Sequence, residues 1–104
     1  MEVEFDPEKS ARNERERGLP FALASELEWD GALIAVDDRQ DHGEERFVAL
    51  APMAGRLYVV CYTIRPVAKP GRRPRAERVR RIISFRKANK REERIYEQAT
   101  TTDR

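Results

Sequence analysis

The sequence predicts a small α+β domain in which one mostly antiparallel sheet is flanked by helices. Its 104 residues suffice for one hydrophobic core but not for two. Four β-like segments follow one another in the central and C-terminal parts of the chain, which favours an antiparallel meander. Helix-favouring segments stand before and after these strands. The predicted order is therefore β-α-α-β-β-β-β-α, in a single domain that spans residues 1–104.

The first two elements are predicted from the N-terminal residues. Residues 3–5 form a short β-like segment. The polar segment 9–17 predicts a helix, because Asp6 ahead of Pro7 is a typical N-cap. Gly18 is the kind of residue that commonly ends a helix, since it adopts a left-handed conformation without strain.

The remaining elements follow from a change in apolar spacing. A second short helix is predicted over residues 21–27, because Leu23 and Leu27 are four residues apart. After this helix, apolar runs bounded by turn residues predict strands. Residues 88–98 predict a final helix, and the tail of residues 100–104 is expected to fray. The predicted strands are 32–36, 46–51, 56–64 and 78–85.

Charge is divided unevenly along the chain. Residues 1–64 contain seven basic and fourteen acidic side chains, whereas residues 65–104 contain fourteen basic and five acidic ones. The balances of −7 and +9 give the overall charge of +2. A basic half of this kind favours contact with a polyanion such as nucleic acid. The alternative is that the acidic half screens the basic half within the molecule.

The densest basic segment is an expected loop at residues 66–77, where prolines and a glycine interrupt any helix or strand. An extended basic loop can hold a nucleic-acid backbone without sequence preference. Two alternatives remain open, namely a solvated insertion and a contact with an acidic segment of a protein partner. The residues expected to bind nucleic acid in and just after this loop are Lys69, Arg72, Arg73, Arg75, Arg78 and Arg80.

Several classes of site are disfavoured by composition. The single cysteine, Cys61, and the single histidine, His42, supply neither a disulfide nor the usual set of metal ligands, so neither a metal nor another cofactor is expected. His42 lies among acidic residues and is expected to have no catalytic role. There is no phosphate-binding loop motif. No signal peptide or membrane-spanning segment is predicted, so the expected location is the cytoplasm, without membrane contact.

A set of short strings occurs in order along the chain. They are residues 5–9, 37–39, 43–47, 62–65 and 81–88, followed by Glu93, Arg94 and Tyr96. In this order they resemble the signature of the BrnT toxin family, over nearly the whole chain from about Val3 to Glu97. The resemblance implies a RelE-like fold, ribonuclease activity and inhibition of translation. It also implies a BrnA-like ribbon-helix-helix antitoxin as partner, and operator DNA bound through the antitoxin complex.

The sequence departs from this family pattern at three places. Arg17 stands where a histidine commonly precedes the glycine, and Phe85 replaces a usual small residue. The connection after Arg65 is longer and more basic than the resemblance leads us to expect. These departures favour an alternative function, that of a non-catalytic nucleic-acid-binding or co-repressor module that acts only with its antitoxin.

Arginine is the predicted catalytic residue type. Cleavage of RNA by its own 2′-hydroxyl needs a base, an acid and cations that stabilise the phosphorane-like transition state, but no metal. Guanidinium groups suit phosphate because they donate two parallel hydrogen bonds and stay charged. Arg65 ends one predicted strand, and Arg81 and Arg86 lie in or just after another, so these side chains converge if the strands are neighbours. The alternative is a solvated charge or an ion pair with Glu92 or Glu93.

Three further side chains are candidates with structural alternatives. Lys87 could act as the base if surrounding arginines lowered its pKa, although a surface lysine is the alternative. Tyr62 and Tyr96 could stack on a base or donate to a phosphate. The alternative for both tyrosines is a place in or beside the core.

Overall fold

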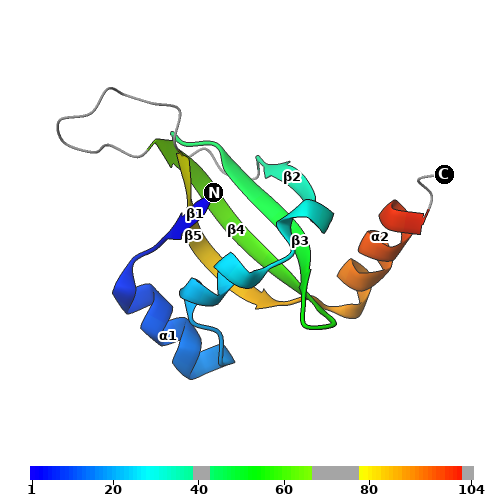
Figure 1. Cartoon of the computed structure of the whole chain (residues 1–104), viewed down its shortest axis with the longest axis horizontal. Helices are drawn as coiled ribbons and strands as arrows, with labels where there is room; N and C mark the ends of the chain where they lie inside the picture. Colours follow the sequence, from blue (N-terminus) through cyan, green and yellow to red (C-terminus); the bar gives the residue numbers. More distant parts are fainter. Residues whose placement is uncertain (39–42, 67–77, 102–104) are drawn as a thin grey trace.

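The chain folds around one five-stranded sheet in the order β1-β5-β4-β3-β2 (Figure 1). A computed structural model describes residues 1–38, 43–66 and 78–101. The elements are β1 Glu2–Glu4, α1 Pro7–Arg17, the 3₁₀ helices η1 Phe21–Glu26 and η2 Trp29–Gly31, β2 Leu33–Asp37, β3 Arg46–Met53, β4 Arg56–Pro66, β5 Arg78–Lys87 and α2 Lys90–Thr101.

The sheet confirms the predicted α+β class. Strands β2, β3, β4 and β5 pair antiparallel in sequence order, as a meander does. The N-terminal strand β1 completes the sheet by pairing parallel to β5, over Val79–Arg81. This parallel pair makes the sheet mixed, and it leaves the rest of the outer edge of β5 without a strand beside it.

Helix α1 has the predicted caps. The Asp6 carboxylate accepts a hydrogen bond of 2.9 Å from the Glu8 N–H, Pro7 begins the helix, and Gly18 ends it at φ 71°. Among the residues of α1 only Ser10 is buried, and its hydroxyl accepts a 2.8 Å hydrogen bond from the Phe21 N–H. Polar contacts therefore hold α1 where most surface helices use an apolar stripe.

Four local expectations need correction. The segment predicted as a helix at residues 21–27 forms a 3₁₀ helix, and η2 was not predicted. The turn predicted between the strands 46–51 and 56–64 is narrower than residues 52–55, because Ala54 and Gly55 alone form it, at φ 52° and 80°. Two left-handed residues match the twist of a tight hairpin, so β3 and β4 continue to its edge. Thr100 and Thr101, expected in a frayed tail, belong to α2.

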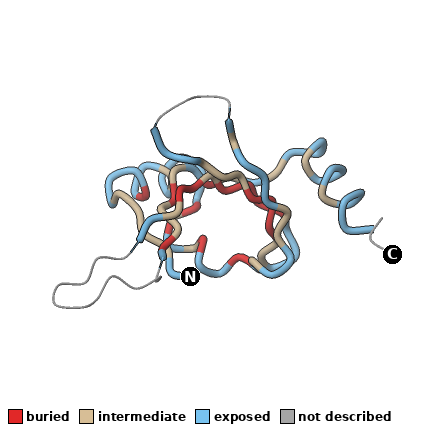
Figure 2. Tube along the Cα trace, turned by 90° about the horizontal axis from the view of Figure 1, so that it is seen from above, coloured by how far each residue is buried: buried red, intermediate tan, exposed pale blue. Residues whose placement is uncertain are grey.

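The two faces of the sheet are covered unequally. The first face packs against η1 and η2 around the fully buried Val60, Tyr62 and Phe85, and no residue of α1 belongs to this cluster. The second face has a smaller apolar cluster of Leu50, Leu57 and Val59, against which Ala88 and Tyr96 pack. Helix α2 has no buried residue and extends away from the sheet (Figure 2). Much of the second face therefore lacks a covering helix.

Candidate nucleic-acid interface

A row of charged residues crosses the second face from edge to edge. Strand register places Asp37 of β2 beside Arg46 of β3, and Arg46 beside Thr63 of β4. Thr63 in turn lies beside Arg81 of β5, which is the partner of Glu4 of β1. Side chains at register partners point to the same face of a sheet. These five residues, which we call the charged row, therefore have basic groups toward the middle and acidic groups at both ends.

The centre of the charged row contains unsatisfied polar atoms. Thr63 is 3% exposed, and its hydroxyl has no hydrogen-bond partner among the described residues. The buried Nε of Arg46 likewise lacks one there. On the other side of Thr63, the Arg81 guanidinium donates a 2.7 Å hydrogen bond to Glu4. Buried polar groups rarely stay unpaired, so these two atoms leave an unmet hydrogen-bonding demand in the middle of the charged row.

Arg65 adds a third guanidinium at the same end of this face. It lies two residues after Thr63 on β4, and residues two apart on a strand point to the same side. Its guanidinium pairs with Glu44 at 3.2 Å, and both side chains are well exposed. Arg46, Arg65 and Arg81 are thus gathered around Thr63. Of the three, Arg46 is not predicted from the sequence, although its position at the start of a strand mirrors that of Arg65 at the end of another.

The expected convergence of Arg65 and Arg86 is wrong. Strands β4 and β5 are antiparallel, so Arg65 lies opposite Val79 whereas Arg86 lies opposite Val59. Six residues along β4 separate these positions, or about 20 Å at the usual rise per residue. Adjacent antiparallel strands place the end of one beside the start of the next. One phosphate group therefore cannot contact both arginines.

Arg86 instead belongs to the junction between β5 and α2. Its guanidinium donates two hydrogen bonds to the Glu92 carboxylate, at 2.9 and 2.7 Å. Glu92 also accepts from the Asn89 N–H, while the Asn89 side chain accepts from the Glu92 N–H, which is a capping box. The hydrogen bond from Arg86 is the main cause that lowers the pKa of Glu92, with further lowering by the Asn89 N–H. Glu92 is thus a charged ion-pair partner.

The other sequence candidates on β5 lie apart from the charged row. Lys87 is exposed and lies opposite Tyr58, whose side chain belongs to the core of the first face. Arg78 is exposed at the start of β5, opposite Pro66. The predicted residues Lys69, Arg72, Arg73 and Arg75, and also His42, lie outside the described residues.

The expectation that Tyr62 contacts RNA is corrected by its burial. Tyr62 is 2% exposed, stacks on Phe47 with ring centroids 5.6 Å apart and meets the edge of Trp29. Burial raises the pKa of its hydroxyl, against the lowering effect of Arg80. The Arg80 guanidinium lies 3.7 Å from the Trp29 ring centroid, so this predicted RNA-binding side chain forms a cation–π contact on the first face.

Tyr96 is half-buried and connects α2 to the body of the protein. Its ring packs on the apolar cluster of the second face, and its hydroxyl donates a hydrogen bond to the Gly31 carbonyl. The structure therefore gives Tyr96 the structural place that sequence reasoning held as the alternative.

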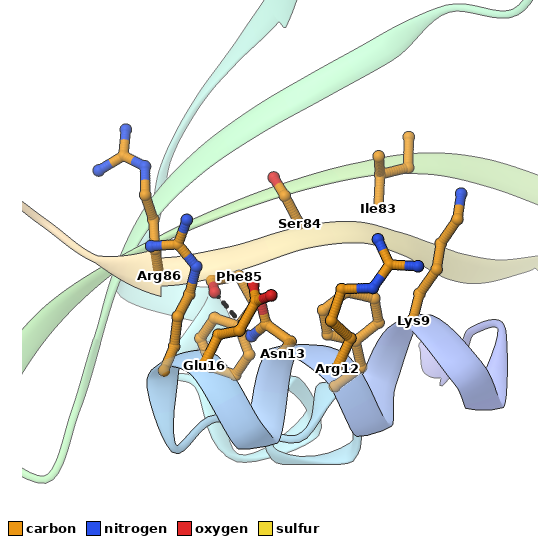
Figure 3. Close-up of a pocket in the computed structure, with 10 residues that line it drawn as sticks. Lys9, Arg12, Asn13, Glu16, Ile83, Ser84, Phe85 and Arg86 are labelled. Carbon is orange, nitrogen blue, oxygen red and sulfur yellow. Dashed lines mark hydrogen bonds between the residues drawn. The ribbon is translucent and has the colours of Figure 1, made fainter.

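A second basic feature lies between α1 and β5. A groove of about 370 Å³ is lined on the helix side by Lys9, Arg12 and Arg17 and on the strand side by Ile83 and Ser84 through Arg86. Its floor is fixed by Asn13, whose amide donates hydrogen bonds to the carbonyls of Leu19 and Phe85 at 2.7 and 2.9 Å (Figure 3). Sequence reasoning did not recognise this groove, because helical periodicity does not say which strand the helix lies against.

Taken together, these features define a small α+β protein with arginines on an incompletely covered sheet face, a design suited to nucleic acid. The sequence matches the family described as the ribonuclease toxin, BrnT, of type II toxin–antitoxin systems, over residues 5–92. The chain therefore belongs to the BrnT family of ribonuclease toxins, as its ordered strings indicated. Such a toxin has RNA as its class of substrate and an antitoxin as its partner. No curated protein matches the chain.

Two of the departures from the family pattern meet in the groove between α1 and β5. Arg17 lines it, and so does Phe85. Phe85 is fully buried and packs its ring against Tyr58, so it contributes to the core beneath the groove. Within the described part of the chain, no helix is long and apolar enough to cross a membrane.

Proposed function

We propose that this chain is an endoribonuclease that cleaves RNA at the charged row and thereby inhibits translation. The observation that carries this proposal is the gathering of three guanidiniums around the Thr63 hydroxyl, which has no partner among the described residues, on a face that α2 leaves open (Figure 2). Donors fixed around one point in advance are what stabilises a phosphorane-like transition state. Arg46, Arg65 and Arg81 are the proposed phosphate-binding residues.

The proposed reaction uses groups that are already neighbours. A phosphate that engages Arg81 competes with Glu4 for its guanidinium and releases the carboxylate, which then takes the proton from the 2′-hydroxyl. The 2′-oxygen attacks phosphorus, and the bond from phosphorus to the 5′-oxygen breaks. Water at this exposed face supplies the proton to the leaving oxygen. The products are a 2′,3′-cyclic phosphate and a 5′-hydroxyl.

This chemistry needs no metal ion, and the small number of metal-ligating side chains supports this part of the proposal. The sequence has one histidine and one cysteine. Among the described residues, no three histidine, cysteine or acidic side chains cluster in a way that would hold a metal. Arginines can supply the positive charge that a metal supplies in other nucleases.

The proposed partner is a BrnA-like ribbon-helix-helix antitoxin that covers the charged row and, in the complex, carries the toxin to operator DNA. The support is electrostatic, because an acidic segment of a partner would satisfy the same guanidiniums that hold phosphate. Pro66 and Arg78, the described residues on either side of the basic segment, are register partners at this end of the sheet.

Cleavage of RNA in excess EDTA tests the proposal. Purified protein is expected to yield fragments ending in 2′,3′-cyclic phosphate, and Arg81→Ala is expected to lower kcat about 100-fold or more. Arg15→Ala is the matched control, because Arg15 is exposed on α1 and lies outside the groove. Full activity of Arg81→Ala would refute the site. Wild-type protein that binds RNA but never cleaves it would instead support the non-catalytic co-repressor function.

A further inference from the structure

The groove between α1 and β5 has a lining that its structural role does not explain. Residues 9, 12, 13 and 16 are spaced to share one face of a helix. A helix that serves packing alone would direct apolar side chains at the neighbouring strand, yet Lys9, Arg12 and Glu16 take these positions. Asn13 alone of this face bonds to β5, through the Phe85 carbonyl. The cationic positions are therefore available for something other than holding the helix.

The cations on the helix side of the groove are unpaired. Neither Lys9, Arg12 nor Arg17 forms a hydrogen bond or an ion pair in the part of the chain that the structure describes. Glu16, one turn after Arg12, does not pair with it either. By contrast, Arg65 and Arg81 of the proposed catalytic face each contact a carboxylate. Three unpaired cations around one concave surface form an anion-binding arrangement.

The groove is continuous with the second face of the sheet. Strand β1 covers the outer edge of β5 only as far as Arg81, and the groove begins beyond it, at Ile83. Figure 3 shows Lys9 and Arg12 extending from α1 toward β5, while Ser84 and Arg86 point away from the helix on the far side of the strand. A chain that crosses the second face can therefore turn around this edge of the sheet and enter the groove.

We propose that this groove is a second binding site for the phosphodiester backbone of RNA, with Lys9, Arg12 and Arg17 as its phosphate contacts. The inference rests on the proposed function, since it extends the path of the same substrate beyond the charged row. A protein segment fits less well, because the apolar residues Phe21 and Phe85 at the base are buried and offer no anchor. Backbone contacts without base contacts make the groove an affinity site with no sequence preference.

The test is binding of a single-stranded 2′-O-methyl RNA oligonucleotide, which lacks the nucleophile for cleavage, followed by fluorescence anisotropy over a range of salt concentrations. The double variant Lys9→Ala/Arg12→Ala is expected to bind roughly tenfold more weakly at 0.15 M salt. The slope of log K against log salt should become less negative by about 1.4, at about 0.7 for each lost phosphate contact. Both positions are exposed on a helix, where alanine is well tolerated. Arg15→Ala, on the same helix, should match wild type.

Cleavage of unmodified RNA separates this inference from the proposed function. The double variant is expected to raise KM and leave kcat near the wild-type value, because the groove lies away from the charged row. Weaker oligonucleotide binding in the double variant, with no cleavage by wild type, would uphold the groove and refute catalysis. Unchanged binding and salt slope in the double variant would overturn the groove, whether or not wild type cleaves. If the double variant loses binding to oligo-glutamate but binds the RNA oligonucleotide as well as wild type does, the groove is a site for an acidic peptide and the proposal is overturned.

Discussion

At the scale of single residues, Thr63 is the clearest case of a side chain that lowers the stability of the fold at the proposed site. Its hydroxyl is buried beneath the arginines of the charged row and has no partner among the described residues. Burying a hydroxyl without a hydrogen bond costs about 1–3 kcal/mol in proteins. The hydroxyl is shielded from solvent, so it can donate to a phosphate oxygen only after the arginine side chains around it rearrange. A residue that costs stability beside the proposed phosphate-binding arginines is typical of a functional site.

Thr63→Val is therefore expected to raise the free energy of unfolding by about 1 kcal/mol, because valine has the same branched shape without the unsatisfied hydroxyl. RNA affinity and cleavage are expected to fall. Urea unfolding and the anisotropy assay measure the two effects, and Thr100→Val on α2 is an exposed control for the loss of a hydroxyl. A less stable Thr63→Val protein would show that the hydroxyl has a partner in solution.

The sequence predicted a residue type for the site but not which residues would meet. Arginine was predicted as the catalytic type from its chemistry, and Arg65 and Arg81 do lie on one face. Arg65 and Arg86 seemed equivalent strand-end residues, yet antiparallel pairing sends them to opposite ends of the sheet. Tyr62 is an aromatic residue of the kind that stacks on bases, and only its position between Phe47 and Trp29 shows that it is buried.

At the scale of elements, α2 is attached through few contacts. It has no buried residue, and its links to the body of the protein include Tyr96 and the pair of Glu92 with Arg86. Glu92 also closes the capping box with Asn89, so one carboxylate both caps α2 and bonds β5. The stability of this helix should therefore depend on the ionisation of Glu92.

Glu92→Gln is expected to destabilise the protein by about 1 kcal/mol at pH 7, through the weakened cap and ion pair. The folded state lowers the pKa of Glu92 from its ordinary 4.5, so its stabilising effect is fully present above pH 4.5. It is lost as the pH falls through the lower folded-state value, where wild type and variant should become equally stable. Urea unfolding from pH 7 to pH 3 measures this difference.

Glu93→Gln controls for this experiment, because Glu93 lies in the same first turn of α2 and shares any helix-dipole effect. A difference between wild type and Glu92→Gln that persists unchanged to pH 3 would contradict the assignment. It would mean that the ionised carboxylate does not hold the helix.

Element types were easier to predict than their neighbours. The Asp6 cap, Pro7 and Gly18 are local signals, and α1 begins and ends where they indicate. Nothing local shows that β1 lies parallel to β5, because that pair joins residues more than seventy positions apart. The register irregularity of β5 opposite Cys61 and Tyr62 is likewise invisible in the sequence. The groove depends on both features, which is why its lining was missed.

At the scale of the whole molecule, ion pairs across the fold connect the acidic N-terminal half of the chain with the basic C-terminal half. The acidic N-terminal half supplies Glu4 and Glu44, which contact Arg81 and Arg65 of the basic half. From the sequence, screening of the basic half by the acidic half and binding of a polyanion were alternatives. The structure is compatible with both. Exposed ion pairs of this kind stabilise a fold by about 1 kcal/mol or less, so phosphate can displace the carboxylates at little cost.

Salt should therefore affect RNA binding and leave the fold nearly unchanged. Six phosphate contacts, namely Arg46, Arg65 and Arg81 at the second face and Lys9, Arg12 and Arg17 in the groove, predict a slope of about −4.2 for log K against log salt. Affinity for the 2′-O-methyl oligonucleotide should then fall about 300-fold between 50 and 200 mM salt. The Tm, measured in the same buffers, should shift only slightly, since the exposed pairs contribute little. A slope near zero would refute the phosphate contacts. A Tm that falls together with RNA affinity as salt rises would show that the ion pairs between the acidic and basic halves hold the fold instead.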